Sequence, residues 1–347
     1  MSVWLPVAPC TPEHCARHDG AVRAPLPAAL RLLSGCGLVL LGVACFPLVR
    51  LLAAGTRGRL TRRWARAVPR AFGVRVTVRH HAPGPVTGGE LVVANHISWL
   101  DVPLVASVLP GRMVAKSEVR RWPLLGPLAA LGGTLFIDRD RLRALPGAVR
   151  DIATALRSGS RVVVFPEGST WCGRGGGPFR PAVFQAAIDA DATVRPVRIA
   201  YRTGPDASGP AAGAVAFVGA DPLPASLWRV VRAAGLTARL DVLAPISASR
   251  EADRRALAHR VRAAVPEPGG PFGGGPADRG PTPPGPLRPP WPATGRTGRP
   301  HPSTTEPPAY RLLPAPRGRP PAGTSPTPPY AVPHRPRTAP RGPAPGS

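Results

Sequence analysis

The sequence predicts an α/β fold with a mostly parallel central sheet flanked by helices. Short runs rich in β-branched residues alternate with amphipathic patterns between about residues 73 and 265, which is typical of strand–helix–strand units. The predicted strands are 73–78, 91–94, 134–137, 161–165, 194–201, 214–218 and 238–243. The helical patterns are clearest over 141–157, 181–190 and 250–265. The flanking regions, 1–72 and 266–347, differ in composition and are predicted to lie outside this domain.

The N-terminal region contains an apolar segment. Residues 1–28 are rich in proline and polar residues and are expected to form a loose arm. Residues 32–49 carry no charged side chain, and a run of this length is about the shortest that spans a bilayer as a helix. The run starts far from the terminus and no clear cleavage site follows, so a secretory signal is not expected. Pro47 would kink such a helix, and a span, a re-entrant hairpin and an interfacial helix all remain open.

A basic amphipathic pattern follows this segment. Leu60, Trp64, Val68 and Phe72 recur every four residues and predict a helix with one apolar stripe. The other positions hold arginines: Arg59, Arg62, Arg63, Arg66 and Arg70. Such a helix suits the surface of an anionic membrane, although it also fits an ordinary helix packed on the domain. Together the two segments predict membrane-associated helices over 29–72 at the cytoplasmic membrane, with the following domain facing the cytoplasm.

The charge of the chain favours polyanionic partners only weakly. The formal net charge is +26, and the chain has 50 Pro and 39 Gly. This bias runs through the whole sequence, which reduces its value as a functional signal. Residues 266–347 have almost no apolar clustering and are expected to be disordered. Anionic membrane lipid is the expected polyanion, whereas nucleic acid is not expected, because aromatic stacking residues are few.

The cysteines predict neither a disulfide framework nor a metal site. An odd number without paired spacing argues against disulfides and fits a reducing compartment. His14 and Cys15 lie close to Cys10, but no second pair of ligands follows in the sequence. No metal ion is therefore expected. The five cysteines are Cys10, Cys15, Cys36, Cys45 and Cys172.

A histidine and an aspartate follow the predicted buried strand 91–94. Reactive groups gather at the carboxyl ends of strands in open α/β sheets, and His96 lies at such an end. Histidine is the side chain most easily poised as a general base near neutral pH, and a carboxylate such as Asp101 can fix its tautomer. In one continuous helix these two side chains would point roughly 140° apart. We therefore expect His96 in a turn and Asp101 in the helix that follows.

Three further motifs lie at predicted strands. The segment Phe165-Pro166-Glu167-Gly168-Ser169-Thr170 follows strand 161–165 and is expected to form a tight turn that exposes a carboxylate. Arg139 lies just past strand 134–137, where its planar fork would suit a phosphate or carboxylate. Pro196 lies inside strand 194–201, which suggests an edge strand or a strand end.

Together these motifs resemble the glycerolipid acyltransferase family, which includes bacterial 1-acylglycerol-3-phosphate acyltransferases. The family pattern places Asn-His-x-Ser-x-x-Asp at 95–101, Phe-Ile-x-Arg at 136–139, Phe-Pro-Glu-Gly-Thr at 165–169 and a Val-Pro block at 194–197. The segments 115–118 and 122–126 are also similar, and the resemblance covers roughly 75–245.

The resemblance implies a role for each matching residue. His96 would deprotonate an acceptor hydroxyl, which attacks the thioester of acyl-CoA or acyl-carrier protein, and Asp101 would orient His96. Arg139 and Lys116 would bind substrate, with Arg139 on the acidic head group. Glu167, Gly168 and Ser169 would shape the acceptor site, and Ser169 stands where the family usually has Thr. The resemblance implies no cofactor beyond the acyl donor as co-substrate.

One departure leaves the acceptor open. Relatives that form phosphatidate commonly have Arg where this chain has Thr170, so Arg139, Arg174 or Arg180 would have to replace it. The expected acceptor is 1-acylglycerol-3-phosphate, giving phosphatidate, and the alternative is another lysolipid such as lyso-ornithine lipid. A different class of function is an inactive, membrane-bound polyanion-binding protein. A thioesterase or lipid hydrolase is disfavoured because the Gly-x-Ser-x-Gly motif is missing. An acyl-enzyme on Cys172 is disfavoured because the sequence places no base beside it.

Overall fold

The computed structural model describes residues 8–81, 88–122, 125–138, 141–204 and 209–265. The chain divides into two units, Met1–Arg279 and Gly280–Ser347, and every described residue belongs to the first. Two predictions therefore fall outside the described residues, namely the disordered tail 266–347 and the position of Arg139.

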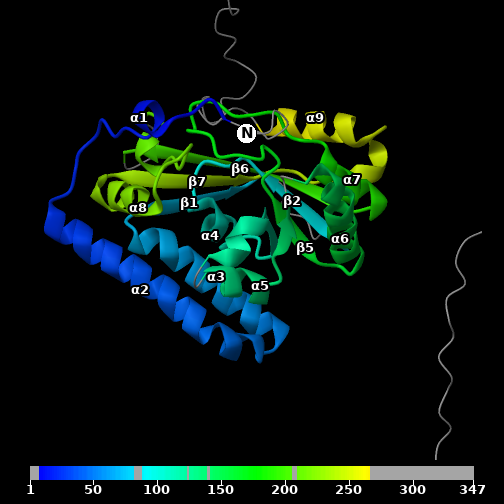
Figure 1. The fold of residues 1–347 in the computed structure, drawn as a ribbon, viewed down its shortest axis with the longest axis horizontal. Coiled ribbons are helices and arrows are strands. Elements are labelled where there is room, and N and C mark those ends of the chain that lie inside the picture. The colour runs from blue at the N-terminus through cyan, green and yellow to red at the C-terminus, as the bar shows by residue number, and fades with distance from the viewer. Residues whose placement is uncertain (1–7, 82–87, 123–124, 139–140, 205–208, 266–347) are drawn as a thin grey trace, which may run out of the picture. The chain divides into compact units, whose positions relative to one another are not determined.

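A mostly parallel sheet forms the centre of the first unit, as the sequence predicts (Figure 1). The strand order is β1-β7-β6-β2-β5-β3-β4, with β8 beside β6. Among the described strands, β6 pairs antiparallel with β7 and β8, and the other pairs are parallel. The strands are β1 (Arg75–His80), β2 (Glu90–Ala94), β3 (Arg112–Lys116), β4 (Leu135–Ile137), β5 (Arg161–Val164), β6 (Thr193–Thr203), β7 (Leu236–Val242) and β8 (Ile246–Ser247).

Helices cover both faces of the sheet, so its middle strands are buried on both sides. In β2, Val92 and Ala94 pack into the cluster that includes α3, α4 and α8, while Leu91 and Val93 pack into the cluster with α6, α7 and α9. This explains why the strand reads as a continuous apolar run. The helices are α1 (Pro12–Cys15), α2 (Pro25–Arg50), α3 (Ala54–Ala71), α4 (Asp101–Ala106), α5 (Leu125–Leu131), α6 (Leu145–Arg157), α7 (Ala182–Asp189), α8 (Leu223–Arg232) and α9 (Arg254–Ala264).

The strand predicted at 214–218 is wrong. This segment contains a 3₁₀ turn, Gly213–Val215, and is buried without joining the sheet. Its backbone carbonyls are paired by a side chain instead, because Arg229 donates to the carbonyls of Ala214 and Ala216 at 3.1 and 2.8 Å. An apolar run that is buried as a loop has the same composition as a strand, and only the distant arginine distinguishes the two.

Pro196 lies in the central strand β6, so the predicted edge or strand end is also wrong. On one side, β6 pairs with β8 through Thr193 and Val194. From Val197 onward the same side pairs with β7. Pro196 therefore lies where the neighbouring strand changes, and a residue without an N–H group is tolerated there.

The N-terminal residues described, 8–24, lie against the domain, which differs from the predicted loose arm. Cys10 and Ala16 are buried. Further along, the Arg23 N–H donates to the carbonyl of Arg232 at 2.8 Å, and the Ala234 N–H donates to that of Ala21 at 2.9 Å. The arm is thus tied to the end of α8 by strand-like backbone hydrogen bonds.

Helices α2 and α3 pack against each other at two close approaches. The indole N–H of Trp64 on α3 donates to the carbonyl of Leu38 on α2 at 2.9 Å. A side chain at Gly42 would overlap Trp64, and one at Gly35 would overlap Phe72. Trp64, Val68 and Phe72 of the apolar stripe therefore pack inward, which is the ordinary-helix alternative, while Leu60 and the arginines of α3 are exposed.

Most of the exposed leucines of this region belong to α2. The helix runs through Pro47 without ending there, and its most apolar 18 residues have a mean hydropathy of 2.3. Length and composition alone allow this helix to cross a membrane. Its exposed leucines recur at spacings of three, four and seven residues, apart from one adjacent pair, and supply an apolar face: Leu26, Leu30, Leu33, Leu40, Leu41 and Leu48.

Candidate active site

The candidate site begins where β2 leaves the sheet at Asn95. The Asn95 side chain continues the pairing of β2 with β6, because its amide donates to the carbonyl of Ile199 at 2.9 Å and its oxygen accepts the Ile199 N–H at 2.8 Å. The side chain thus replaces a backbone rung at the point where the chain turns. The next residue, His96, is held at the carboxyl end of the strand.

His96 and Asp101 meet across the turn. The Nδ1 atom of His96 lies 2.8 Å from Oδ2 of Asp101, and Asp101 is the first residue of α4. The turn between strand and helix removes the divergence that a continuous helix would impose at this spacing. The geometry expected from the sequence is therefore present: His96 lies in the turn and Asp101 begins the helix that follows.

Asp101 is fully buried and accepts four hydrogen bonds. Besides His96, the backbone N–H groups of Ile97 and Ser98 donate to Oδ2 at 2.6 and 2.9 Å. The hydroxyl of Tyr201 donates to Oδ1 at 2.6 Å. A buried carboxylate is stable only when its oxygens are compensated by donors in this way.

Tyr201 is the site residue that sequence reasoning missed. It is buried on β6, and burial together with the charge of Asp101 raises its pKa well above the ordinary value. The phenol therefore stays protonated and donates. The available signal was a hydroxyl-bearing side chain at the end of the predicted strand 194–201. The partner lies 100 residues away, however, and nothing local in the sequence indicates it.

We expect Tyr201→Phe to lower the free energy of unfolding by about 1.5–3 kcal/mol, the usual contribution of a buried hydrogen bond to a charged group. Turnover should fall only several-fold, because three donors to Asp101 remain. Denaturant unfolding in detergent measures the first effect, and thiol release measures the second. An unfolding free energy equal to that of the wild type would mean that the phenol contributes nothing to holding Asp101.

The two nitrogen atoms of the His96 imidazole differ in their surroundings: Nδ1 is hydrogen-bonded to Asp101, and Nε2 lies on the other side of the ring. Because a carboxylate accepts at Nδ1, that nitrogen carries the proton and Nε2 carries the lone pair. Among the described residues, no hydrogen bond is recorded for Nε2, and 22% of the side chain is exposed. The ring stacks on Phe165, with centroids 4.2 Å apart and planes inclined by 19°. A base oriented in this way can take a proton from a hydroxyl that approaches from solvent or lipid.

Glu167 is buried, which corrects the expected exposed carboxylate. Its Oε2 accepts the N–H of His96 at 2.7 Å, and its Oε1 accepts the N–H of Gly177 at 3.1 Å. Burial raises its pKa to about 7, although these two N–H groups and the charge of Arg262 pull the pKa down. The side chain thus fixes the backbone of His96.

The pKa of Glu167 predicts a pH-dependent contribution to stability. Between the ordinary pKa of 4.5 and about 7, Glu167 keeps its proton in the folded state but loses it in the unfolded state. The stability that this proton contributes is therefore full below pH 4.5 and is lost as the pH rises through about 7. The expected change is about 3 kcal/mol. Glu167→Gln cannot titrate, and the difference in unfolding free energy between wild type and variant should shrink by this amount across the window. The matched control is Glu118→Gln at an exposed position. A difference that stays constant with pH would contradict the raised pKa.

Neighbouring loops hold the rest of the His96 backbone. The Trp171 N–H donates to the carbonyl of His96 at 2.8 Å, and the Phe217 N–H donates to that of Ile97 at 3.0 Å. The hydroxyl of Thr170 donates to the carbonyl of Phe217. Thr170 therefore serves as a link between the two loops. The buried segment 213–218, mistaken for a strand, is part of the frame of the site.

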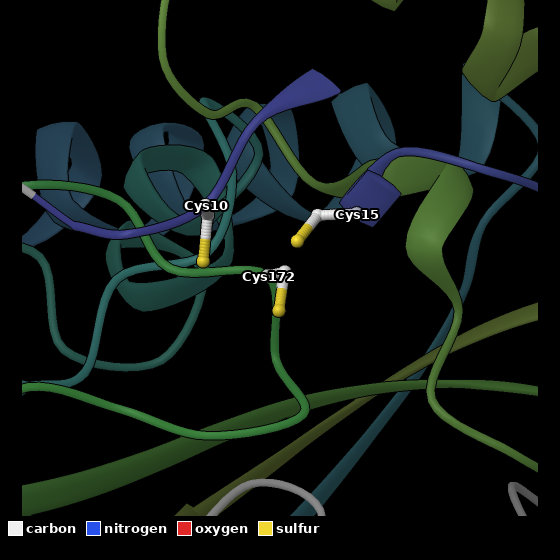
Figure 2. Close-up of side chains that lie close together, drawn as sticks. All are labelled: Cys10, Cys15 and Cys172. Carbon is white, nitrogen blue, oxygen red and sulfur yellow. The ribbon is translucent and has the colours of Figure 1, made fainter. Parts of the chain in front are cut away.

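The other residues predicted to bind substrate are Gly168, Ser169, Lys116 and Arg139. Gly168 has a φ of 77° in the turn after β5, where a glycine is required, and Ser169 beside it is half-buried. Lys116 is exposed at the end of β3. Arg139 is outside the described residues. Cys172 lies with Cys10 and Cys15 in a small buried cluster (Figure 2), so a role as an acyl-accepting thiol gains no support.

Comparison with known proteins gives consistent matches. The model of a family described as Acyltransferase matches residues 74–200. The chain is 36% identical over 212 residues to a 1-acyl-sn-glycerol-3-phosphate acyltransferase of Neisseria meningitidis serogroup B, covering 60% of this chain and 80% of that protein. It is 37% identical over 211 residues to a lyso-ornithine lipid O-acyltransferase of Pseudomonas aeruginosa, covering 60% and 78%.

A solved structure shares the fold. The crystal structure of a 1-acyl-sn-glycerophosphate (LPA) acyltransferase from Thermotoga maritima matches with a TM-score of 0.54 and 19% sequence identity. The match covers 69% of this chain and 93% of that one. At this identity the likeness supports the architecture, not the substrate.

Proposed function

Because this chain belongs to the acyltransferase family and is an O-acyltransferase, we propose that it moves a fatty acyl group from an acyl thioester to the hydroxyl of a lysolipid. The observation that carries the proposal is the imidazole of His96, whose Nδ1 is held by a buried carboxylate while Nε2 is left open. Acyl-CoA and acyl-carrier protein are the two donors considered. In the proposed reaction they act as co-substrates, and no cofactor takes part.

The proposed reaction is a direct transfer. Nε2 of His96 removes the proton of the acceptor hydroxyl as its oxygen attacks the thioester carbonyl, forming a tetrahedral intermediate. The C–S bond then breaks, and the leaving thiolate takes the proton back from His96. Asp101 stabilises the imidazolium that exists between these two steps. Glu167 and Tyr201 act on positioning, the first through the backbone of His96 and the second through Asp101.

The first acceptor proposed is 1-acylglycerol-3-phosphate, which would give phosphatidate. A second candidate, lyso-ornithine lipid, is favoured by one observation. The position where phosphatidate-forming relatives commonly carry Arg is occupied by Thr170, and its hydroxyl is engaged with the carbonyl of Phe217. Arg174 and Arg180 are exposed nearby in sequence and, with Arg139, are the cations proposed to replace that Arg. Proteins named for each activity are similar to this chain at almost equal identity.

A panel of acceptors tests the proposal. The full chain in detergent would be given labelled acyl-CoA with lysophosphatidate, lyso-ornithine lipid, or a neutral lysophospholipid, and both thiol release and labelled product would be followed. Product with lysophosphatidate supports the first acceptor, and product with lyso-ornithine lipid alone supports the second. Thiol release without acylated product would indicate hydrolysis. Failure with every acceptor, repeated with acyl-carrier protein as donor, would favour the inactive polyanion-binding alternative.

We also propose that the enzyme works at the cytoplasmic face of the membrane. Helix α2 supplies the apolar anchor, and the exposed arginines of α3 supply attraction to anionic lipid head groups. The corresponding layout keeps 29–72 as the membrane-associated part and 73–265 as the acyltransferase domain. Substituting Leu33 and Leu41 with Glu should release the chain from anionic vesicles in a flotation assay.

A further inference from the structure

Three cysteines from distant parts of the chain meet in one cluster. Cys10 and Cys15 come from the docked N-terminal arm, and Cys172 comes from the loop after β5. Their sulfur atoms all lie within 4.8 Å of one another. Figure 2 shows the sulfurs at the corners of a triangle, two carried by the arm and one by the loop. The cluster goes beyond the acyl-transfer function and does not depend on it.

We infer that Cys10, Cys15 and Cys172 bind a thiophilic divalent metal ion, most simply Zn²⁺, through three thiolates. Four residues separate Cys10 from Cys15, which is within the spacing of paired cysteine ligands in structural zinc sites. Zinc–sulfur bonds of about 2.3 Å in a tetrahedral site place the sulfurs about 3.8 Å apart. Because the three sulfurs already lie within 4.8 Å of one another, binding the ion requires each sulfur to move by less than about 1 Å.

The surroundings fit three ligands with one open position. Cys10 and Cys172 are buried and pack with Ala216 and Val218, while Cys15 is half-buried and leaves one side accessible. The side chain of His14 is hydrogen-bonded to Thr11 at 3.1 Å and does not join the sulfurs. Water or a small external ligand would therefore complete a tetrahedral site.

The charge balance also suits a metal thiolate. Burial raises the pKa of the Cys172 thiol, but the Arg174 backbone N–H and the thiols of Cys10 and Cys15 outweigh that effect, so its pKa is lowered overall. Burial raises the pKa of Cys10 to about 12. A divalent cation bound by the three sulfurs would displace the thiol protons and take their place. Three thiolates and Zn²⁺ leave one negative charge beside Arg174.

Because the cluster lies beside the loops that hold His96, a bound metal ion would also affect the candidate active site. Cys172 is adjacent to Trp171, whose N–H donates to the carbonyl of His96. The arm bearing Cys10 and Cys15 approaches closely at Gly213, where a side chain would overlap the carbonyls of Cys15 and Arg17. A bound ion would therefore tie the arm to the loops that hold His96 in place.

Metal analysis of the full-length protein tests this inference. The protein would be purified under reducing conditions with a tag free of histidine, and its zinc content and the absorption of its Co²⁺-substituted form would be measured. We expect about one zinc per chain, and a Co²⁺ spectrum with sulfur charge-transfer bands and the intensity of a tetrahedral site. Cys172→Ser and Cys15→Ser should lower the zinc content at least about tenfold. The matched control, Cys45→Ser on α2, should keep it.

Thermal unfolding gives a second readout that does not depend on activity. A chelator should lower the midpoint of the wild type and of Cys45→Ser, but not that of a variant lacking a cluster cysteine. If Cys172→Ser fails to fold, Cys15→Ser, at the half-buried position, carries the test. Three results would overturn the inference: no bound zinc in the wild type, equal zinc in the cluster variants, or a disulfide between two of the three cysteines in reduced preparations.

Discussion

We expect His96→Ala to reduce the rate of thiol release by about 10²–10⁴-fold, the usual contribution of a positioned general base. The loss should appear in kcat, because the alanine removes proton transfer and leaves the binding surfaces in place. The fold should persist, since the imidazole is partly exposed and its backbone is held independently by Glu167 and Trp171. Initial rates with the best acceptor of the panel, over a range of acceptor concentrations, give the measurement.

The control for this variant is another exposed histidine. His259 lies on the surface of α9, and His259→Ala should match the wild type in rate and in unfolding. Wild-type turnover in His96→Ala would remove the general base from the mechanism. An increase in the KM for the acceptor with an unchanged kcat would instead assign His96 to acceptor binding.

We expect Asp101→Asn to have the second largest effect, a loss of about 10²–10⁴-fold in turnover. The amide cannot stabilise an imidazolium as a carboxylate does, and its NH₂ group would favour the wrong tautomer of His96. In the place of Oδ2, where it meets His96, the same NH₂ group would also face the backbone N–H groups of Ile97 and Ser98, which are already donors. Unfolding free energy should therefore fall by at least about 2 kcal/mol.

Two measurements separate the two effects of Asp101→Asn. Unfolding in denaturant reports the loss of stability, and turnover at a temperature where the variant remains folded reports the chemical loss. The matched control is Asp151→Asn on the exposed face of α6, which should change neither quantity. A fully folded Asp101→Asn with wild-type turnover would show that the carboxylate serves neither function.

The parts of the fold and site that could be predicted are those encoded in short stretches of sequence. The turn from β2 into α4 brings His96 and Asp101 together within six residues, so the spacing and the apolar strand before it were sufficient. The strand-end position of Glu167 follows in the same way. Its burial does not, because its partners are backbone N–H groups contributed by other segments.

The parts that could not be predicted depend on contacts between distant segments. Tyr201 reaches Asp101 from β6, and Cys172 reaches two cysteines of an arm that was expected to be loose. The segment 214–218 has the composition of a strand, and its carbonyls are paired by the side chain of Arg229. Local sequence patterns contain no information on which of these remote partners is present.

The pairing of β2 with β5 determines where the chain can accommodate insertions and deletions. Val93 lies opposite Val164, and His96 and Glu167 each follow three residues later, so the two segments leave the sheet in step. Inserting or deleting one residue in either strand would shift one segment by about 3.3 Å and exchange the faces of its side chains. We therefore expect natural variants of this enzyme to gain and lose residues in their surface loops while keeping 90–96 and 161–167 constant in length.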